Sequence, residues 1–278
     1  MVGAGRWTGL TMKNYQPKYR WKISKQQKTL LIYIHKFRFV STDILAEILE
    51  KDRSTIYERL SVLEKQKYIL KQHDSSYRLR RRPASFCLAP LGIRTLKDNP
   101  GVEQISLRQS YRNKSLTEEQ IDDCLQVANI YLHFRRYYPK QFDCFTKYQL
   151  DRDKFIRPTP VLSIHGKTDK IPDYLVDIVP AKLQTWIIRK RIAQHENFAE
   201  DSEQYYPHVL FIAGNNNTEK RIVRSTEERY NDFRFYTTTI ERLLGGDMKK
   251  LWQDPDVFSE LEDNEEPKRA ALPLRLGE

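Results

Sequence analysis

Cysteine is scarce in this sequence of 278 residues, which contains Cys87, Cys124 and Cys144. Their number is odd, they lie far apart, and no CxxC pair or Cys/His ligand spacing accompanies them. The sequence therefore argues against a disulfide framework and predicts no zinc site. Each cysteine stands in an apolar pattern, so we expect three small buried side chains and a reducing, cytoplasmic location.

Long apolar runs are also missing. No stretch approaches the roughly 20 consecutive apolar residues that cross a bilayer, so we expect no membrane partner. Residues 1–23 lack the apolar centre of a signal peptide. They read instead as a basic arm with Trp7, Tyr15, Tyr19 and Trp21, which either follows a DNA groove or is disordered.

The common catalytic signatures are absent too. There is no GxSxG, no phosphate-binding GxxxxGK[ST] and no HExxH, which excludes the enzyme classes that depend on them. Histidines are scattered, and although tyrosine is plentiful, no HxH cluster accompanies it as a tyrosine-dependent relaxase would need.

Positive charge is what the chain has in excess, with a formal net charge of +11. It is unevenly spread: residues 1–115 hold 24 Lys and Arg against 9 Asp and Glu, and the remainder holds 24 against 28. The excess therefore belongs to the N-terminal part, which predicts a polyanionic partner for that part.

The stretch 41–89 has the element order of a winged helix-turn-helix. Apolar residues recur at helical spacing in two short segments joined by residues 50–53, which forces two helices to share one core. Tyr68-Ile69-Leu70 then reads as a strand, 73–76 as a turn and 85–88 as a returning strand. Helices predicted at 24–37 and 90–96 complete a domain over 24–99. His35 is expected on the solvent side of the first of these helices.

The second short helix and the hairpin, or wing, carry the candidate DNA contacts. The N-terminal residues of such a helix reach base edges in the major groove, and clustered guanidinium groups repel one another unless an anion such as phosphate lies between them. The candidates are Arg53, Ser54, Thr55, Tyr57 and Arg59 on the helix, and Arg78, Arg80, Arg81 and Arg82 on the wing. The predicted partner is double-stranded DNA, bound by a monomer or a homodimer. A solvated hairpin, or a surface for protein contacts, is the alternative.

The rest of the chain predicts a mixed α/β domain. Residues 100–116 are polar and basic and read as a linker. Between 117 and 250, helical patterns alternate with apolar runs such as 174–179 and 208–213, which are typical of buried strands. Residues 157–170 look irregular. The tail 251–278 is acidic and is expected either to fray or to fold back on the basic part.

The order of these parts resembles the replication-relaxation family of plasmids and mobile elements. The resemblance covers about 24–244 and rests on the winged helix and on the segments SFCLAPLGIRTL, TEEQIDDCLQVANIYLHF, IPDYLVDI and YYPHVLFIAG. It implies an α+β or α/β fold, with an N-terminal winged helix followed by a mixed α/β domain like the PD-(D/E)xK nuclease core. It also implies DNA binding connected with plasmid replication or its control.

A nuclease would need carboxylates that hold Mg²⁺ and usually a nearby lysine. Pro172-Asp173 matches the start of the PD-(D/E)xK pattern, but the triplet that should supply acid, any residue and Lys is Pro180-Ala181-Lys182. Asp173, Asp177 and Lys182 are the candidate catalytic residues, with both aspartates predicted on one strand face. On the other interpretation, Asp173 caps a turn and the domain holds no metal, no cofactor and no catalytic residue.

Three functions therefore stay open. The first is a DNA-binding accessory or regulatory protein whose α/β domain is a non-catalytic scaffold. The second is an enzyme, a divergent Mg²⁺-dependent DNA endonuclease. The third is a protein-interaction module that does not bind DNA.

Overall fold

The computed structural model describes residues 23–72, 83–137, 142–149, 161–166, 173–201, 206–226, 234–246, 248–254 and 269–270. The arm 1–22 and the wing residues 73–82 lie outside these ranges, as does most of the acidic tail. Predictions made for those segments stay predictions.

The N-terminal part of the chain has the predicted winged-helix order. Its elements are α1 (Lys25–Phe37), β1 (Val40–Ser41), α2 (Thr42–Leu49), α3 (Arg53–Lys65), β2 (Ile69–Gln72) and β3 (Ser85–Leu88). β3 pairs antiparallel with β1 on one side and with β2 on the other. β1 is an element that the sequence patterns did not predict.

Local sequence explains where these helices begin and end. Ser24 caps α1 in a reciprocal capping box with Gln27, and the Ser41 side chain accepts from the Ile44 N–H at the start of α2. Glu50 ends α2 in the left-handed conformation, with φ 52°. This sharp stop lets α3 cross α2, so that their apolar faces meet in one core. The buried residues there are Ile44, Leu45, Ile48, Ile56, Leu60 and Leu63.

The segment 100–116 is not the expected linker. After α5 (Pro90–Leu96), it forms α6 (Gln104–Gln109) and a 3-10 helix, η1 (Ser110–Ser115). Val102 and Leu107 are buried in the main core, and Glu103 caps α6 by accepting from two backbone N–H groups. Burial of these two apolar side chains and the cap on α6 thus fold this segment although its composition is polar. We call residues 23–115 the winged-helix unit.

His35 is also placed differently from the expectation. It is buried, with 4% of its surface exposed, because α6 covers that side of α1. Its Nε2 lies 3.2 Å from the Ser106 hydroxyl. Burial lowers the pKa of His35 to about 4, although nearby Glu103 opposes the shift. The ring is therefore neutral at pH 7.

The C-terminal part is the predicted mixed α/β structure. It comprises α7 (Glu118–Tyr137), β4 (Phe142–Thr146), β5 (Leu162–Gly166), β6 (Tyr174–Val179), α8 (Thr185–Asp201), β7 (His208–Ala213), α9 (Asn216–Thr226), β8 (Phe235–Thr239), α10 (Ile240–Gly245), η3 (Met248–Lys250), β9 (Trp252–Gln253) and β10 (Arg269–Ala270). The sheet order is β10-β9-β8-β7-β6-β5-β4, parallel across β6, β7 and β8 and antiparallel elsewhere. We call residues 142–270 the sheet unit.

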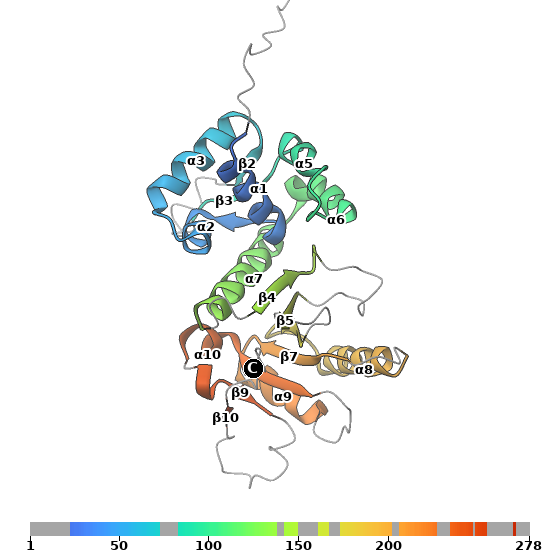
Figure 1. Ribbon diagram of the computed structural model, residues 1–278. Coiled ribbons are helices and arrows are strands. Elements are labelled where there is room, and N and C mark those ends of the chain that lie inside the picture. The colour runs from blue at the N-terminus through green and yellow to red at the C-terminus, as the bar shows by residue number, and fades with distance from the viewer. Residues whose placement is uncertain are drawn as a thin grey trace, which may run out of the picture.

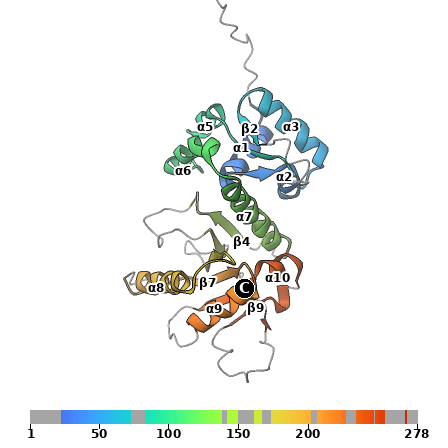
Figure 2. The ribbon, with the colours of Figure 1, turned by 180° about the vertical axis from the view of Figure 1, so that it is seen from behind.

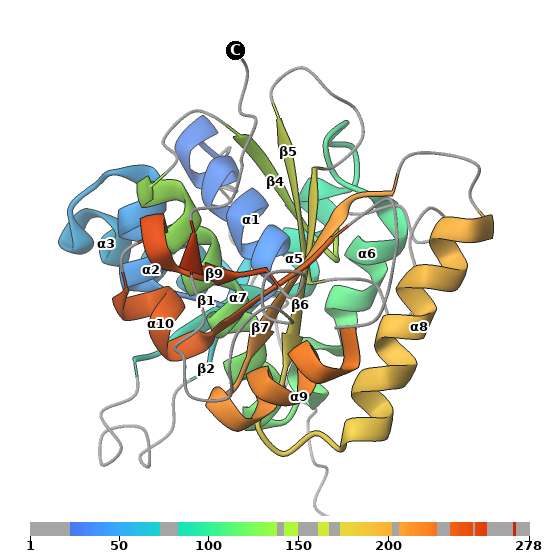
Figure 3. The same cartoon turned by 90° about the horizontal axis from the view of Figure 1, so that it is seen from below.

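Each face of this sheet packs against a different layer. Alternate residues of a strand point to opposite faces, so Val176 and Leu210 pack toward α7 while Leu175 and Val209 pack toward α8 and α9. Figure 3 shows α8 on the opposite side of β6 and β7 from α10 and α2. Strands covered on both faces explain why the sequence of β6 and β7 is almost continuously apolar.

The two units share one core. In Figures 1 and 2, α7 lies between the winged-helix unit and the sheet unit. One cluster of buried side chains runs from Leu30 of α1 through Phe134 of α7 to Trp252 of β9. Thr117 and Gln120 form a capping box at the start of α7, since the side chain of each accepts a hydrogen bond from the other's backbone N–H. The helix α3 and the sheet are thus held in a fixed relation.

Two further expectations are corrected. The stretch 157–170 is not irregular throughout, since β5 forms at Leu162–Gly166 between β4 and β6. The tail does not fray at its start, because Leu251 and Trp252 are buried. Arg269 also holds the buried Glu219 of α9 through both terminal nitrogens, at 2.9 and 3.0 Å.

Candidate nucleic-acid interface

The N-terminal half of α3 is exposed and polar, as the sequence predicted. Arg53, Ser54 and Tyr57 are exposed, whereas Thr55 and Arg59 are half-buried at the flanks of the helix. Tyr57 has 51% of its surface exposed although it is a large aromatic residue. An exposed aromatic ring with arginine and serine beside it has the chemistry to contact bases, sugars and phosphates.

A hollow of about 370 Å³ adjoins this face of α3. Its wall is formed by the first turns of α2 and α3 and by the start of β3. The residues that line it are Thr42, Asp43, Arg53, Ser54, Tyr57, Pro83, Ala84 and Phe86. Pro83 and Ala84, which follow the wing in the sequence, line the hollow, and Gln72 pairs with Ser85 at the ends of β2 and β3. Lys71 of β2 adds a cation, with its Nζ 5.9 Å from the centre of the Tyr57 ring.

Arg53 is ion-paired at the mouth of the hollow. Its Nε lies 2.6 Å from the Asp43 carboxylate of α2, and the two side chains are 72% and 54% exposed. Such an exposed pair contributes about 0–1 kcal/mol to stability at most. Its main effect is on the direction of the Arg53 side chain.

The wing arginines, Arg78, Arg80, Arg81 and Arg82, lie outside the described residues. Their predicted phosphate contacts are therefore untested.

The far end of α2 is fastened to α7. Arg136 holds Glu47 through two nitrogens, and Arg135 bonds both Glu50, at 3.0 Å, and the Ile48 carbonyl. These contacts give a cationic partner to Glu47 of α2 and to Glu50, the residue that ends the helix. They also fix the helix-turn-helix against the rest of the molecule.

The candidate nuclease residues are not brought together. Asp173 and Asp177 stand four residues apart on and just before β6, which at about 3.3 Å per residue separates them by roughly 13 Å. A shared strand face would therefore not bring the two carboxylates within reach of one metal ion. Lys182 is exposed beyond the end of β6. Within the described residues, no group of three His, Cys, Asp or Glu side chains could hold a metal ion.

Asp177 instead belongs to a buried network between β6 and α8. Arg191 donates to both carboxylate oxygens, at 2.6 and 3.0 Å, and His195 Nε2 lies 2.9 Å from Oδ2. His195 Nδ1 is 2.7 Å from the Tyr206 hydroxyl. Arg191 and His195 are one helical turn apart, so both reach the same strand residue.

The charges in this network stabilise the packing of α8 against β6. Burial by itself would raise the pKa of Asp177, but the His195 hydrogen bond and the Arg191 charge outweigh it and hold the pKa at about 2. Burial also lowers the pKa of His195, against the pull of Asp177. A neutral His195 thus donates to Asp177 and accepts from Tyr206. With its oxygens occupied in this way, Asp177 is a poor metal ligand.

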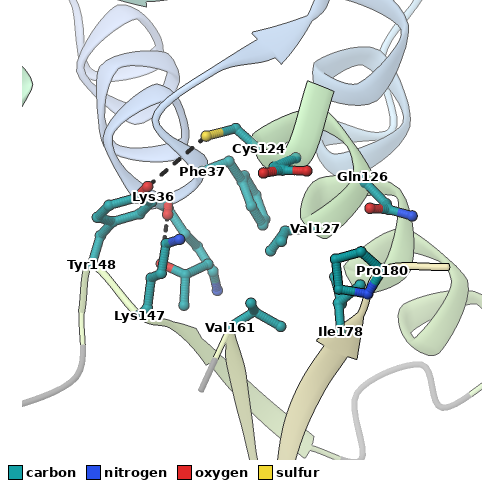
Figure 4. Close-up of a pocket in the computed structure, with 12 residues that line it drawn as sticks. Lys36, Phe37, Cys124, Gln126, Val127, Lys147, Tyr148, Val161, Ile178 and Pro180 are labelled. Carbon is teal, nitrogen blue, oxygen red and sulfur yellow. Dashed lines mark hydrogen bonds between the residues drawn. The ribbon is translucent and has the colours of Figure 1, made fainter. Parts of the chain in front are cut away.

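A second concavity, of about 120 Å³, lies where the two units meet. Figure 4 shows Phe37 and Val127 facing each other, with Lys147 and Tyr148 on one side and Ile178 and Pro180 on the other. Two polar groups beside it are hydrogen-bonded to the backbone. Lys36 Nζ donates to the Cys144 carbonyl, and the Thr146 hydroxyl donates to the Lys36 carbonyl. These contacts tie α1 to β4.

The sequence patterns did not reveal Asp43, Lys71 or the internal partners of Asp177. Asp43 precedes Arg53 by ten residues on a different helix, and no periodic pattern links them. The sequence did contain a sign of Arg191 and His195, because both are polar residues on the face of α8 that packs against the sheet.

Comparisons with known proteins do not place the chain in a family. No family model matches it, and no curated protein matches it. The transcriptional regulator SlyA is a solved structure with some similarity, at 19% sequence identity and a TM-score of 0.24, covering 41% of this chain and 75% of that one. A likeness at this level carries no argument about function. Among the described helices, none has the length and apolarity to cross a membrane.

Proposed function

We propose that this protein binds double-stranded DNA through the exposed N-terminal half of α3 and the basic wing. The observation that carries the proposal is the polar, exposed start of α3 at the edge of the hollow that it forms with α2 and the start of β3. It falls in the part of the chain that holds 24 basic residues against 9 acidic ones. A helix of this kind fits the major groove, and a basic wing beside it can reach phosphates.

At a finer level, we propose an accessory or regulatory role in the replication of a plasmid or mobile element, or in its control. This rests on the resemblance to the replication-relaxation family and on the order of the parts. In this proposal the sheet unit is a non-catalytic scaffold that needs no cofactor. The buried Asp177 network and the separation of Asp173 from Asp177 favour it over the endonuclease. A homodimer on the DNA stays a prediction.

The test is binding of labelled duplexes, after selection from a random pool, over a range of salt concentrations. We expect the binding constant to fall steeply with salt, with a logarithmic slope of roughly −4 or steeper, because several phosphates are neutralised. Arg53→Ala should lower the discrimination between sites more than it lowers affinity for random DNA. Arg189→Ala, an exposed arginine on α8, is the matched control and should change neither.

The same preparation separates the other functions. Nicking of supercoiled plasmid that requires Mg²⁺ and is abolished by Asp173→Ala would replace the scaffold with an endonuclease. Absence of duplex binding near 50 mM salt, where electrostatic contacts are strong, would leave a protein-interaction module.

A further inference from the structure

Asp43 forms an ion pair with the Arg53 side chain. Arg53 Nε lies 2.6 Å from Asp43 Oδ1. A guanidinium has donors on two usable edges: the Nε side, and the end formed by the two terminal nitrogens. Because the closest contact of this ion pair is at Nε, the far end of the guanidinium, with one N–H on each terminal nitrogen, stays available for a ligand.

Those two parallel N–H groups match one base edge in particular. Guanine presents O6 and N7 as adjacent acceptors in the major groove, and arginine binds them in a bidentate manner. An unrestrained arginine must give up rotamer freedom to adopt this geometry, at a cost of up to about 2 kcal/mol. A carboxylate that already fixes the guanidinium reduces that cost.

The position of the pair fits this role. Arg53 is the first residue of α3, and Asp43 is in the first turn of α2. Both line the hollow beside the exposed face of α3. In water the exposed pair contributes little. In a DNA groove, where water is excluded, the attraction between the two charges strengthens.

We propose that Asp43 is a positioning residue that orients Arg53 to read one guanine in the major groove of the target DNA. This inference rests on the proposed DNA binding. A carboxylate at a DNA surface also repels phosphate, so Asp43 lowers affinity for random DNA while it raises selectivity. The two effects have opposite signs and can be measured separately.

The experiment uses the full chain and its preferred duplex, selected from a random pool. Each base pair of that duplex is changed in turn, and the dissociation constants are measured for the wild type, Asp43→Ala, Arg53→Ala and the double variant. We expect Asp43→Ala to lower the preference for guanine at one position by about tenfold, or about 1.4 kcal/mol, while affinity for random DNA stays equal or rises. The double variant should lose no more selectivity than Arg53→Ala.

Asp52→Ala is the matched control. Asp52 stands next to Arg53 and is exposed, but its side chain makes no capping bond to α3. Its removal deletes the same charge from a residue adjacent to Arg53 in the sequence, so all sequences should gain affinity alike. A uniform gain for Asp43→Ala as well, or additive losses in the double variant, would overturn the inference and leave DNA binding intact. Failure of the wild type to bind any duplex would overturn both.

Discussion

Two aspartate–arginine pairs in this molecule have the same closest contact and opposite surroundings. Asp43 with Arg53, and Asp177 with Arg191, each join Nε to a carboxylate oxygen at 2.6 Å. In the first pair the side chains are 54% and 72% exposed, and in the second they are 8% and 13% exposed. The first pair borders a hollow, and the second is enclosed by β6, α8 and the Tyr206 hydroxyl.

The difference shows that the distance between two charged groups does not identify a functional pair. The charges of a buried pair have lost their hydration, so removing either partner leaves a buried charge without compensation. An exposed pair adds little stability but keeps donors available for a ligand. In this chain the carboxylate that the sequence offered as a metal ligand is structural, and the pair that the sequence did not indicate borders the proposed interface.

The largest expected effect is on the buried pair. Asp177→Ala should lower the free energy of unfolding by about 3–5 kcal/mol, because it leaves the Arg191 charge buried without its carboxylate. Asp43→Ala, the matched exposed change, should lower it by less than about 1 kcal/mol. Urea unfolding followed by circular dichroism measures both. Similar losses for the two variants would remove the contrast between the pairs.

The next effect concerns the wing. Replacing Arg78, Arg80, Arg81 and Arg82 together with alanine should weaken binding to every duplex by about a hundredfold at physiological salt. The logarithmic salt slope should become shallower by roughly 0.9 for each phosphate that the variant no longer neutralises. Fluorescence anisotropy over a salt series measures both quantities. A slope equal to that of the wild type would mean that these arginines do not touch the DNA backbone.

A smaller effect depends on pH. The pKa of His35 lies at about 4 in the folded protein, below the ordinary 6.5, because of burial. Between these values the unfolded chain binds more protons, so stability is full above pH 6.5, is lower by about 2 kcal/mol at pH 5 and is lower by about 3 kcal/mol at pH 4. His35→Leu should flatten the stability curve in that window. A parallel curve for the variant would assign the acid sensitivity elsewhere, for instance to His195.

How much the sequence could predict follows from what each pattern contains. Periodicity placed α1, α2, α3, β6 and β7, because their apolar faces are built from local spacing. It failed for 100–116, where Val102 and Leu107 are too few to form a pattern but enough to bury the segment. It also failed for β1 and β9, which are two residues long and held by partners distant in the chain.

The candidate site divides in the same way. The exposed face of α3 was predictable, since Ile56, Leu60 and Leu63 define its buried side. Asp43 was not, because its relation to Arg53 depends on how α2 crosses α3. Strand alternation predicts that Asp173 and Asp177 share a face. It does not bring their carboxylates together, because the two positions are four residues apart along the extended chain.

The most direct test of the central claim is photo-crosslinking to duplex DNA from two exposed aromatic positions. Benzoylphenylalanine is placed at Tyr57 of α3 in one variant and at Trp186 of α8 in the other, residues that are 51% and 61% exposed. A DNA-binding surface on α3 predicts strong crosslinks from position 57, which disappear at high salt, and few from position 186. Equal crosslinking from both positions, or crosslinking from position 186 with none from position 57, would contradict it.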